Sequence, residues 1–122
     1  MLSLDTHVLV ALLDDKLTTS EESIILAEEL AISDIVLWEI SKLVQLGRLK
    51  LDLNDDRFRE GLRALTVFPI TLEIARISTA LDFSSDPADE IIAATSIVEG
   101  APLVTRDRKI LKSRIVRLAK AR

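Results

Sequence analysis

The chain has 122 residues, 48% of them apolar, no cysteine and a formal net charge of −4 at pH 7. These values predict one folded domain over residues 1–122, and they exclude a disordered protein, disulfides and thiolate zinc sites. No apolar run reaches the roughly 20 residues of a membrane span, and no signal peptide is recognisable, so we expect a cytoplasmic protein.

Apolar runs alternate with capped segments along the chain. Ser, Thr, Asp or Asn caps mark the helix starts, and Gly47 ends one helix. In the first half of the chain we expect a strand at 2–4, a helix at 7–13, a helix from Thr18 to about Leu30, a strand or turn at 31–33, and a helix from Asp34 to about Leu46 capped by Ser33. In the middle we expect a helix capped by Asn54 or Asp55 and ending at Ala64, a strand at 67–70, and a helix from Thr71 or Leu72 to about Leu81. The last part should form a helix from Asp86-Pro87 to near Gly100, a strand at 102–105, a helical turn at 107–111 and a last strand at 115–118. Pro69 favours a sheet edge for its strand. Strands that alternate with helices predict an α/β fold, in which helices flank a central, mostly parallel sheet.

Four acidic residues lie in or beside the apolar runs: Asp5, Glu39, Asp89 and Asp107. Asp5 and Asp107 each follow an expected strand, and sites in parallel sheets form beyond the carboxyl ends of the strands. Carboxylates gathered there would repel one another, and a hard divalent cation such as Mg²⁺ or Mn²⁺ would remove that conflict. Such a cluster in a small α/β protein indicates phosphoryl-transfer or phosphodiester chemistry.

Each of these acids also has a possible structural role. Asp5 and Asp107 can cap the helical segments that follow them, and Thr105 can be a turn residue. Glu39 can pair on the surface with Lys42, three residues further along its helix.

The start of the helix after residue 85 leaves two roles open. Asp86 fits the N-cap and Pro87 the first helical position, which makes Asp86 structural. Asp89 then occupies the position of a capping-box acid, and it can serve the helix, a metal, or both. Glu90 should point elsewhere, since it lies about 100° further round the helix.

Charge is unevenly distributed along the chain. Residues 105–122 carry eight basic residues and one acid, a net +7, whereas the other residues carry eight basic and 19 acidic residues, a net −11. Such a basic strip can hold a polyanion if metal neutralises the acidic pocket, or it can be a solvated last segment. His7 is the only histidine, and we expect it to be structural.

Four motifs, in this order and in a chain of this length, resemble the PIN-domain family, and in particular the VapC-type toxins of prokaryotic toxin–antitoxin pairs. The motifs are Leu4-Asp-Thr-His-Val-Leu, Leu37-Trp-Glu-Ile, Asp86-Pro-Ala-Asp with Ile92-Ala-Ala-Thr, and Leu103-Val-Thr-Arg-Asp. The resemblance covers essentially the whole chain.

The resemblance implies an endoribonuclease that depends on Mg²⁺ or Mn²⁺, forms a homodimer and is blocked by a small antitoxin protein. It implies metal binding by Asp5, Glu39, Asp89 and Asp107, with Thr105 as a nearby hydroxyl. The family usually has Arg directly after the position of Asp89, and this chain has Glu90 there instead.

Two other functional classes are compatible with these features. The first is a binding or regulatory module with the same fold and an inactive site, for which Glu90 is the only indication. The second is a phosphoacceptor receiver domain, which needs an Asp at the end of a strand midway along the chain. The run Val67-Phe-Pro-Ile lacks that Asp, so we rank the receiver last.

Overall fold

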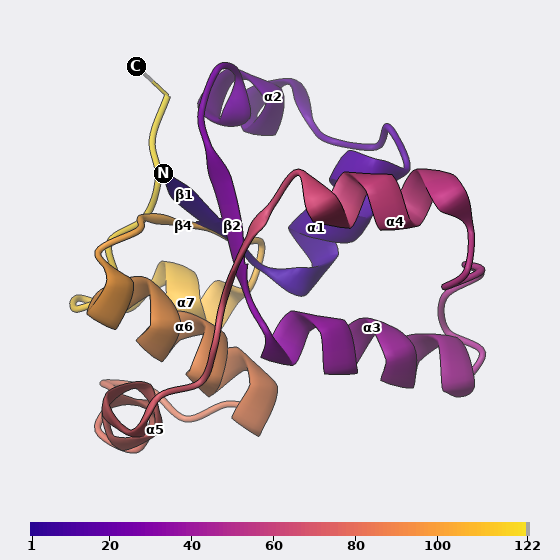
Figure 1. Ribbon diagram of the computed structural model, residues 1–122. Helices are drawn as coiled ribbons and strands as arrows, with labels where there is room; N and C mark the ends of the chain where they lie inside the picture. The colour runs from indigo at the N-terminus through magenta and orange to yellow at the C-terminus, as the bar shows by residue number, and fades with distance from the viewer. Residues whose placement is uncertain (122) are drawn as a thin grey trace.

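A four-stranded parallel sheet forms the centre of the structure, a computed structural model that describes residues 1–121 (Figure 1). The strands lie in the order β3-β2-β1-β4, with β1 at Leu2–Leu4, β2 at Leu30–Ser33, β3 at Thr66–Phe68 and β4 at Leu103–Val104. The predicted α/β fold with a parallel sheet is therefore confirmed, as is the edge position of the strand that precedes Pro69.

Seven helices surround this sheet within residues 1–121. They are α1 (Thr6–Leu13), α2 (Thr19–Ile25), α3 (Ile35–Gln45), α4 (Asp56–Arg63), α5 (Leu72–Ser78), α6 (Pro87–Glu99) and α7 (Arg108–Leu111). In Figure 1, α1, α3 and α4 gather on one side of the strands, and α5, α6 and α7 gather on the other. None of the helices in this range is long and apolar enough to cross a membrane.

Side-chain caps start several of these helices, as the sequence predicts. At α2, the Glu21 N–H donates to Thr18 Oγ1 at 3.1 Å, and the Thr18 N–H donates to Glu21 Oε1 at 2.9 Å, which forms a capping box. Asp55 and Thr71 accept backbone N–H groups at the starts of α4 and α5. Each such cap stabilises its helix by about 1 kcal/mol.

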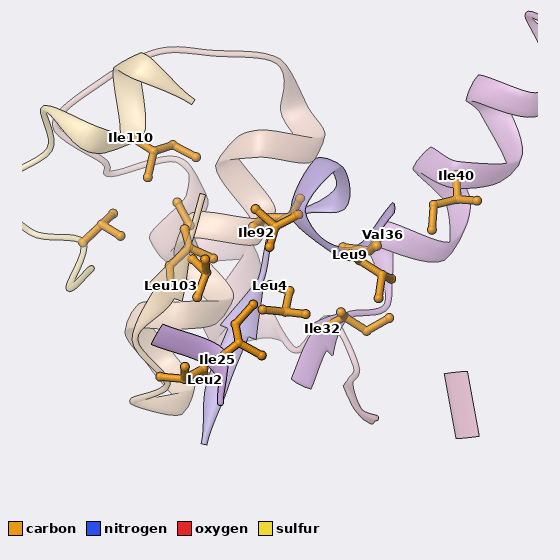
Figure 2. Close-up of a cluster of buried hydrophobic side chains, with 14 of the residues drawn as sticks. Leu2, Leu4, Leu9, Ile25, Ile32, Val36, Ile40, Ile92, Leu103 and Ile110 are labelled. Carbon is orange, nitrogen blue, oxygen red and sulfur yellow. The ribbon is translucent and has the colours of Figure 1, made fainter. Parts of the chain in front are cut away.

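One hydrophobic core joins the sheet to its helices. Figure 2 shows Leu4 and Ile32 of the strands close to Leu9, Val36 and Ile92 of the helices, and all five side chains are fully buried. Burial of each side chain of this size contributes about 1.5–3 kcal/mol. Because this core anchors β1 and β4, which pair with each other, the residues at positions 5 and 105 lie side by side at one edge of the sheet.

The predicted extension of a helix from Thr18 to Leu30 is wrong. Helix α2 ends at Ile25, because Leu26 turns to an extended conformation (φ −53°, ψ 127°) and Ala27 adopts a positive φ of 63°. Leu30 then pairs with Leu2 in the sheet. The apolar run that resembles the end of a helix therefore supplies β2, where both faces can be buried.

One predicted strand and one further helix end are also wrong. Residues 115–118 do not form a strand. They make a single isolated bridge between Leu103 and Leu118, and the preceding turn is held by Ser113 Oγ, which accepts two backbone N–H groups. Helix α5 ends at Ser78 rather than near Leu81, and the hydroxyls of Ser78 and Thr79 donate back to carbonyls of the last turn.

Candidate metal centre

Three carboxylates converge at the carboxyl edge of the sheet. Asp5 follows β1, Glu39 lies on α3, which follows β2, and Asp89 lies in the first turn of α6. One oxygen of each lies within 4.8 Å of the other two. The elements that carry these residues are separated by long stretches of sequence, so the parallel topology of the sheet is what brings them together.

Asp5 is the most buried of the three, with 5% of its surface exposed. Its Oδ1 accepts the Thr6 N–H at 2.7 Å, and its Oδ2 accepts the Thr105 hydroxyl at 2.6 Å. The Asp5 N–H donates to the Val104 carbonyl at 3.0 Å. Asp5 thus caps α1, as its structural role predicts, and is also held toward the other two acids.

Glu39 points into the acid cluster rather than pairing with Lys42. The Thr6 hydroxyl donates to Glu39 Oε1, and the neighbouring Ile40 is 1% exposed. Lys42 Nζ donates instead to Gln45 Oε1 at 2.7 Å. The surface ion pair considered from the sequence is therefore absent from the described residues.

The start of α6 differs from the predicted cap. Asp86 occupies the N-cap position, but its side chain makes no capping hydrogen bond. Asp89 Oδ2 accepts the Ser85 hydroxyl at 3.0 Å, and Glu90 Oε2 accepts the Ser85 N–H at 3.3 Å. Asp86 therefore does not cap α6 through its side chain. Ser85, just before the N-cap, instead bonds to Asp89 and Glu90, and the Asp89 carboxylate faces the cluster.

Within the cluster, the surroundings of Asp89 raise its pKa. The pKa of Asp89 is raised to about 6, first by partial burial and also by the charges of Asp5, Glu39 and Asp107, against the Ser85 hydroxyl bond, which lowers it. A cation at this point would relieve both the burial cost and the repulsion.

The donor set suits a hard divalent cation. Oxygens bound to one Mg²⁺ at about 2.1 Å lie at most about 4.2 Å apart, so small side-chain shifts from the observed spread of 4.8 Å would let these three share an ion. Carboxylate oxygens favour Mg²⁺ or Mn²⁺ over soft metals.

Asp107 and Thr105 lie beside the three acids but are not part of the converging group. Asp107 Oδ1 caps α7, accepting the N–H groups of Lys109 and Ile110 at 2.9 and 3.0 Å. Asp107 also lines one pocket of about 280 Å³ together with Asp5, Glu39 and Asp89. It is outside the group of oxygens within 4.8 Å, so metal binding by Asp107 stays a prediction.

The sequence did not point to two hydroxyl residues at this site. Thr6 holds Glu39, and Ser85 holds Asp89. Each lies close in sequence to an acid at a helix start, which is the only signal that could have found it. His7, expected to be structural, is instead exposed and lines the pocket.

Comparison with known proteins identifies the family of the chain. The family model of the PIN domain matches residues 2–115. The chain belongs to the PIN-domain family. It is 33% identical to Ribonuclease VapC22 of Mycobacterium tuberculosis over 94 residues, which cover 72% of this chain and 70% of that protein. The resemblance to VapC-type members of the PIN-domain family is thus confirmed.

Solved structures share the fold. A toxin–antitoxin complex from Klebsiella pneumoniae matches with a TM-score of 0.70 and 24% identity, over 92% of this chain and 91% of that one. VapBC2 from Rickettsia felis, bound to a DNA fragment from their promoter, matches with a TM-score of 0.68 and 21% identity, over 95% of both chains. At these identities the match establishes the PIN fold alone.

Proposed function

We propose that this protein is an endoribonuclease that hydrolyses RNA phosphodiester bonds with Mg²⁺ or Mn²⁺. The observation that carries the proposal is the convergence of Asp5, Glu39 and Asp89 in a chain of the PIN-domain family. The name of the relative from Mycobacterium tuberculosis, a ribonuclease, supports RNA as the substrate. Glu90, which accepts the Ser85 N–H just before α6, does not line the acidic pocket and so gives no support to an inactive site.

The acids of the pocket divide the work between holding the ion and handling water. Asp5, Glu39 and Asp89 would hold the metal, with Asp107 as the fourth predicted ligand. When bound, the ion lowers the pKa of water and neutralises charge that develops on the phosphate. Glu39, held by the Thr6 hydroxyl, would also orient the attacking water. No side-chain nucleophile is required.

Basic side chains beside the acids supply a surface for the RNA backbone. Arg108 and Lys109 line a pocket of about 410 Å³ together with Asp86, Asp89 and Asp107. They belong to the basic segment 105–122. A cation next to the reacting phosphate would hold flanking phosphates of the chain and offset the repulsion of the acids.

We expect metal-dependent cleavage that Asp5→Asn removes. Purified protein and structured RNA are incubated while Mn²⁺ or Mg²⁺ is titrated against EDTA. Asn is nearly isosteric with Asp but lacks the charge that a hard cation needs, so Asp5→Asn and Asp89→Asn should each lose roughly 100-fold or more of the activity. Asp86→Asn is the matched control. Asp86 lines the same pocket but is not one of the three converging acids, so this variant should keep most of the activity.

Two outcomes would contradict this assignment. Cleavage that EDTA does not reduce would exclude the metal mechanism. An inactive Asp86→Asn variant beside an active Asp89→Asn variant would reverse the roles of the two acids at the start of α6.

A protein partner and a second copy of the chain complete the proposal. The partner is a cognate antitoxin that presents an Arg to the acidic pocket, where it can pair bidentately with a carboxylate. The fold shared with toxin–antitoxin complexes supports this partner. Trp38 of α3 and Leu46 at its C-cap are 55% and 59% exposed, and exposed apolar side chains of this kind favour a homodimer. An RNA substrate fits the cytoplasm as the location.

A further inference from the structure

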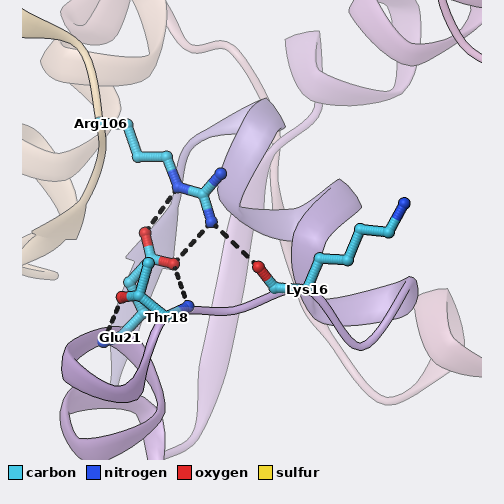
Figure 3. Close-up of polar contacts among 4 residues, drawn as sticks. All are labelled: Lys16, Thr18, Glu21 and Arg106. Carbon is cyan, nitrogen blue, oxygen red and sulfur yellow. Dashed lines mark hydrogen bonds and ion pairs between the residues drawn. The ribbon is translucent and has the colours of Figure 1, made fainter.

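An ion pair outside the acid cluster ties the loop between β4 and α7 to the start of α2. Arg106 Nε donates to Glu21 Oε2 at 2.7 Å, and Arg106 Nη2 donates to Glu21 Oε1 at 2.6 Å (Figure 3). Nη2 also reaches the Lys16 carbonyl oxygen at 3.4 Å. Two parallel bonds between a guanidinium and a carboxylate fix orientation as well as distance.

The acceptor of this pair is already held in place by its own helix. Glu21 is 8% exposed and is the acid of the capping box with Thr18, as Figure 3 shows. The bond to Arg106 holds the pKa of Glu21 down at about 2, so the carboxylate is charged at neutral pH. Glu21 is thus a rigid anchor, and Arg106 is the group that it restrains.

The restrained residue sits in the middle of a turn that contacts the site. The Thr105 hydroxyl donates to Asp5 Oδ2 at 2.6 Å and accepts the Asp107 N–H at 3.0 Å. Arg106 is the residue between these two. Its side chain therefore constrains the backbone that sets the position of the Asp5 carboxylate and of Asp107.

We propose that Arg106 is a positioning residue for the metal centre, and that Glu21 holds it through the two-bond pair. The inference rests on the proposed function, because it assumes that the acids bind a divalent cation. In this proposal Arg106 acts on the position of the acids and does not itself bind at the metal centre. Two donor nitrogens of Arg106 are committed to Glu21, and its positive charge in the pocket opposes cation binding.

Because the positive charge of Arg106 opposes cation binding, the direction in which its removal changes Mn²⁺ affinity tests the proposal. If Arg106 acted only as a charge, its removal would tighten Mn²⁺ binding, because a nearby cation would be gone. If it acts by positioning, its removal weakens Mn²⁺ binding. Glu21→Gln alone would weaken Mn²⁺ binding under either reading, because it leaves the charge of Arg106 unpaired. The double variant Arg106→Gln with Glu21→Gln gives the second test, since it removes one charge of each sign and Glu21 does not line the acidic pocket.

The experiment measures Mn²⁺ affinity from the electron paramagnetic resonance signal of the free ion, without RNA. We expect Arg106→Gln and Glu21→Gln each to weaken binding by roughly 10-fold, the size of effect seen when a group that orients a ligand is lost. The double variant should be no weaker than either single variant, because both remove one interaction. Arg106→Lys keeps the charge but cannot form the two-bond pair with Glu21, so its affinity should lie between that of the wild type and that of Arg106→Gln.

Asp55→Ala controls for a general loss of stability. It removes the cap of α4, where Asp55 Oδ1 accepts the Arg57 N–H at 2.8 Å, and α4 carries none of the acids of the cluster. It should lower the melting temperature and leave Mn²⁺ affinity unchanged. All variants are measured at a temperature at which circular dichroism shows them folded, so that affinity reports on the site.

The outcomes separate this inference from the proposed function. Wild-type binding of Mn²⁺ together with unchanged or tighter binding by Arg106→Gln, or unchanged binding by the double variant, would overturn the positioning role alone. If the wild-type protein neither binds Mn²⁺ nor cleaves RNA, the proposed function fails, and the inference fails with it.

Discussion

At the residue scale, Asp89 is where burial and charge conflict most. Its pKa is raised from 3.8 to about 6, first by burial and then by the neighbouring acids. Between about pH 4 and pH 6 the folded chain keeps a proton on Asp89 that the unfolded chain has released. The free energy of unfolding therefore gains from Asp89 below pH 4, and this gain is lost as the pH rises through about 6.

We expect Asp89→Asn to stabilise the metal-free protein at neutral pH by about 1–2 kcal/mol, with allowance for partial exposure. The difference in free energy of unfolding between variant and wild type should be small at pH 4 and largest above pH 6. Added Mn²⁺ should stabilise the wild type at neutral pH, because it binds only the folded state, and should stabilise the variant less. Thermal melts at several pH values measure all three. A difference that does not depend on pH would mean that folding does not raise the pKa of Asp89.

The acids could be predicted from the sequence, but the residues that hold them could not. Asp5, Glu39 and Asp89 stand out because a charged side chain in an apolar run is costly without compensation. The hydroxyls of Thr6 and Ser85 are common at helix starts, so nothing in the sequence distinguishes them. Their roles depend on which acid the fold places opposite each of them, which is a tertiary fact.

At the element scale, helix starts were predictable and helix ends were less so. A start depends on local chemistry, as the capping box at α2 shows. The end of α2 depends on the sheet instead, because pairing of Leu30 with Leu2 takes the chain out of the helix. The strand predicted at 115–118 does not form. Its apolar pattern is typical of a strand, but this segment pairs with β4 through only one bridge.

The end of α2 carries a testable local cost. Ala27 has a φ of 63°, a conformation that costs a residue with a Cβ atom about 1–2 kcal/mol. We expect Ala27→Gly to raise the free energy of unfolding by about 0.5–1 kcal/mol, since the added freedom of the unfolded chain offsets part of the relief.

Asp15, with a φ of 54°, is the matched control for this prediction. Asp tolerates the left-handed region better than Ala does, so Asp15→Gly should stabilise the protein less. Chemical denaturation of the three proteins measures the difference. Destabilisation by Ala27→Gly would show that the turn after α2 gains something from the methyl group that outweighs the backbone cost.

At the scale of the whole molecule, charged and apolar side chains remain uncovered on different elements. The carboxyl edge of the sheet carries the acids and the adjoining basic side chains. Large apolar side chains remain exposed on α3 and its C-cap, and on the edge strand β3 with the residues after it: Trp38, Leu46, Val67, Ile70 and Leu72. The segment 49–53, which carries three leucines, packs partly against the core. Helix α3 is therefore the better candidate for an interface.

We expect the isolated protein to be a homodimer in solution, with Trp38 of α3 and Leu46 at its C-cap covered by the second copy. Light scattering should give a mass of about twice the 13.6 kDa of one chain, and the fluorescence of Trp38, the only tryptophan, should shift to longer wavelength on dilution into monomer. Leu46→Glu places a charge in the proposed interface and should favour the monomer. Leu26→Glu is the matched control, because Leu26 is also exposed but lies at the end of α2. A wild-type protein that scatters as a monomer at all concentrations, or a Leu26→Glu variant that dissociates while Leu46→Glu does not, would remove α3 as the interface.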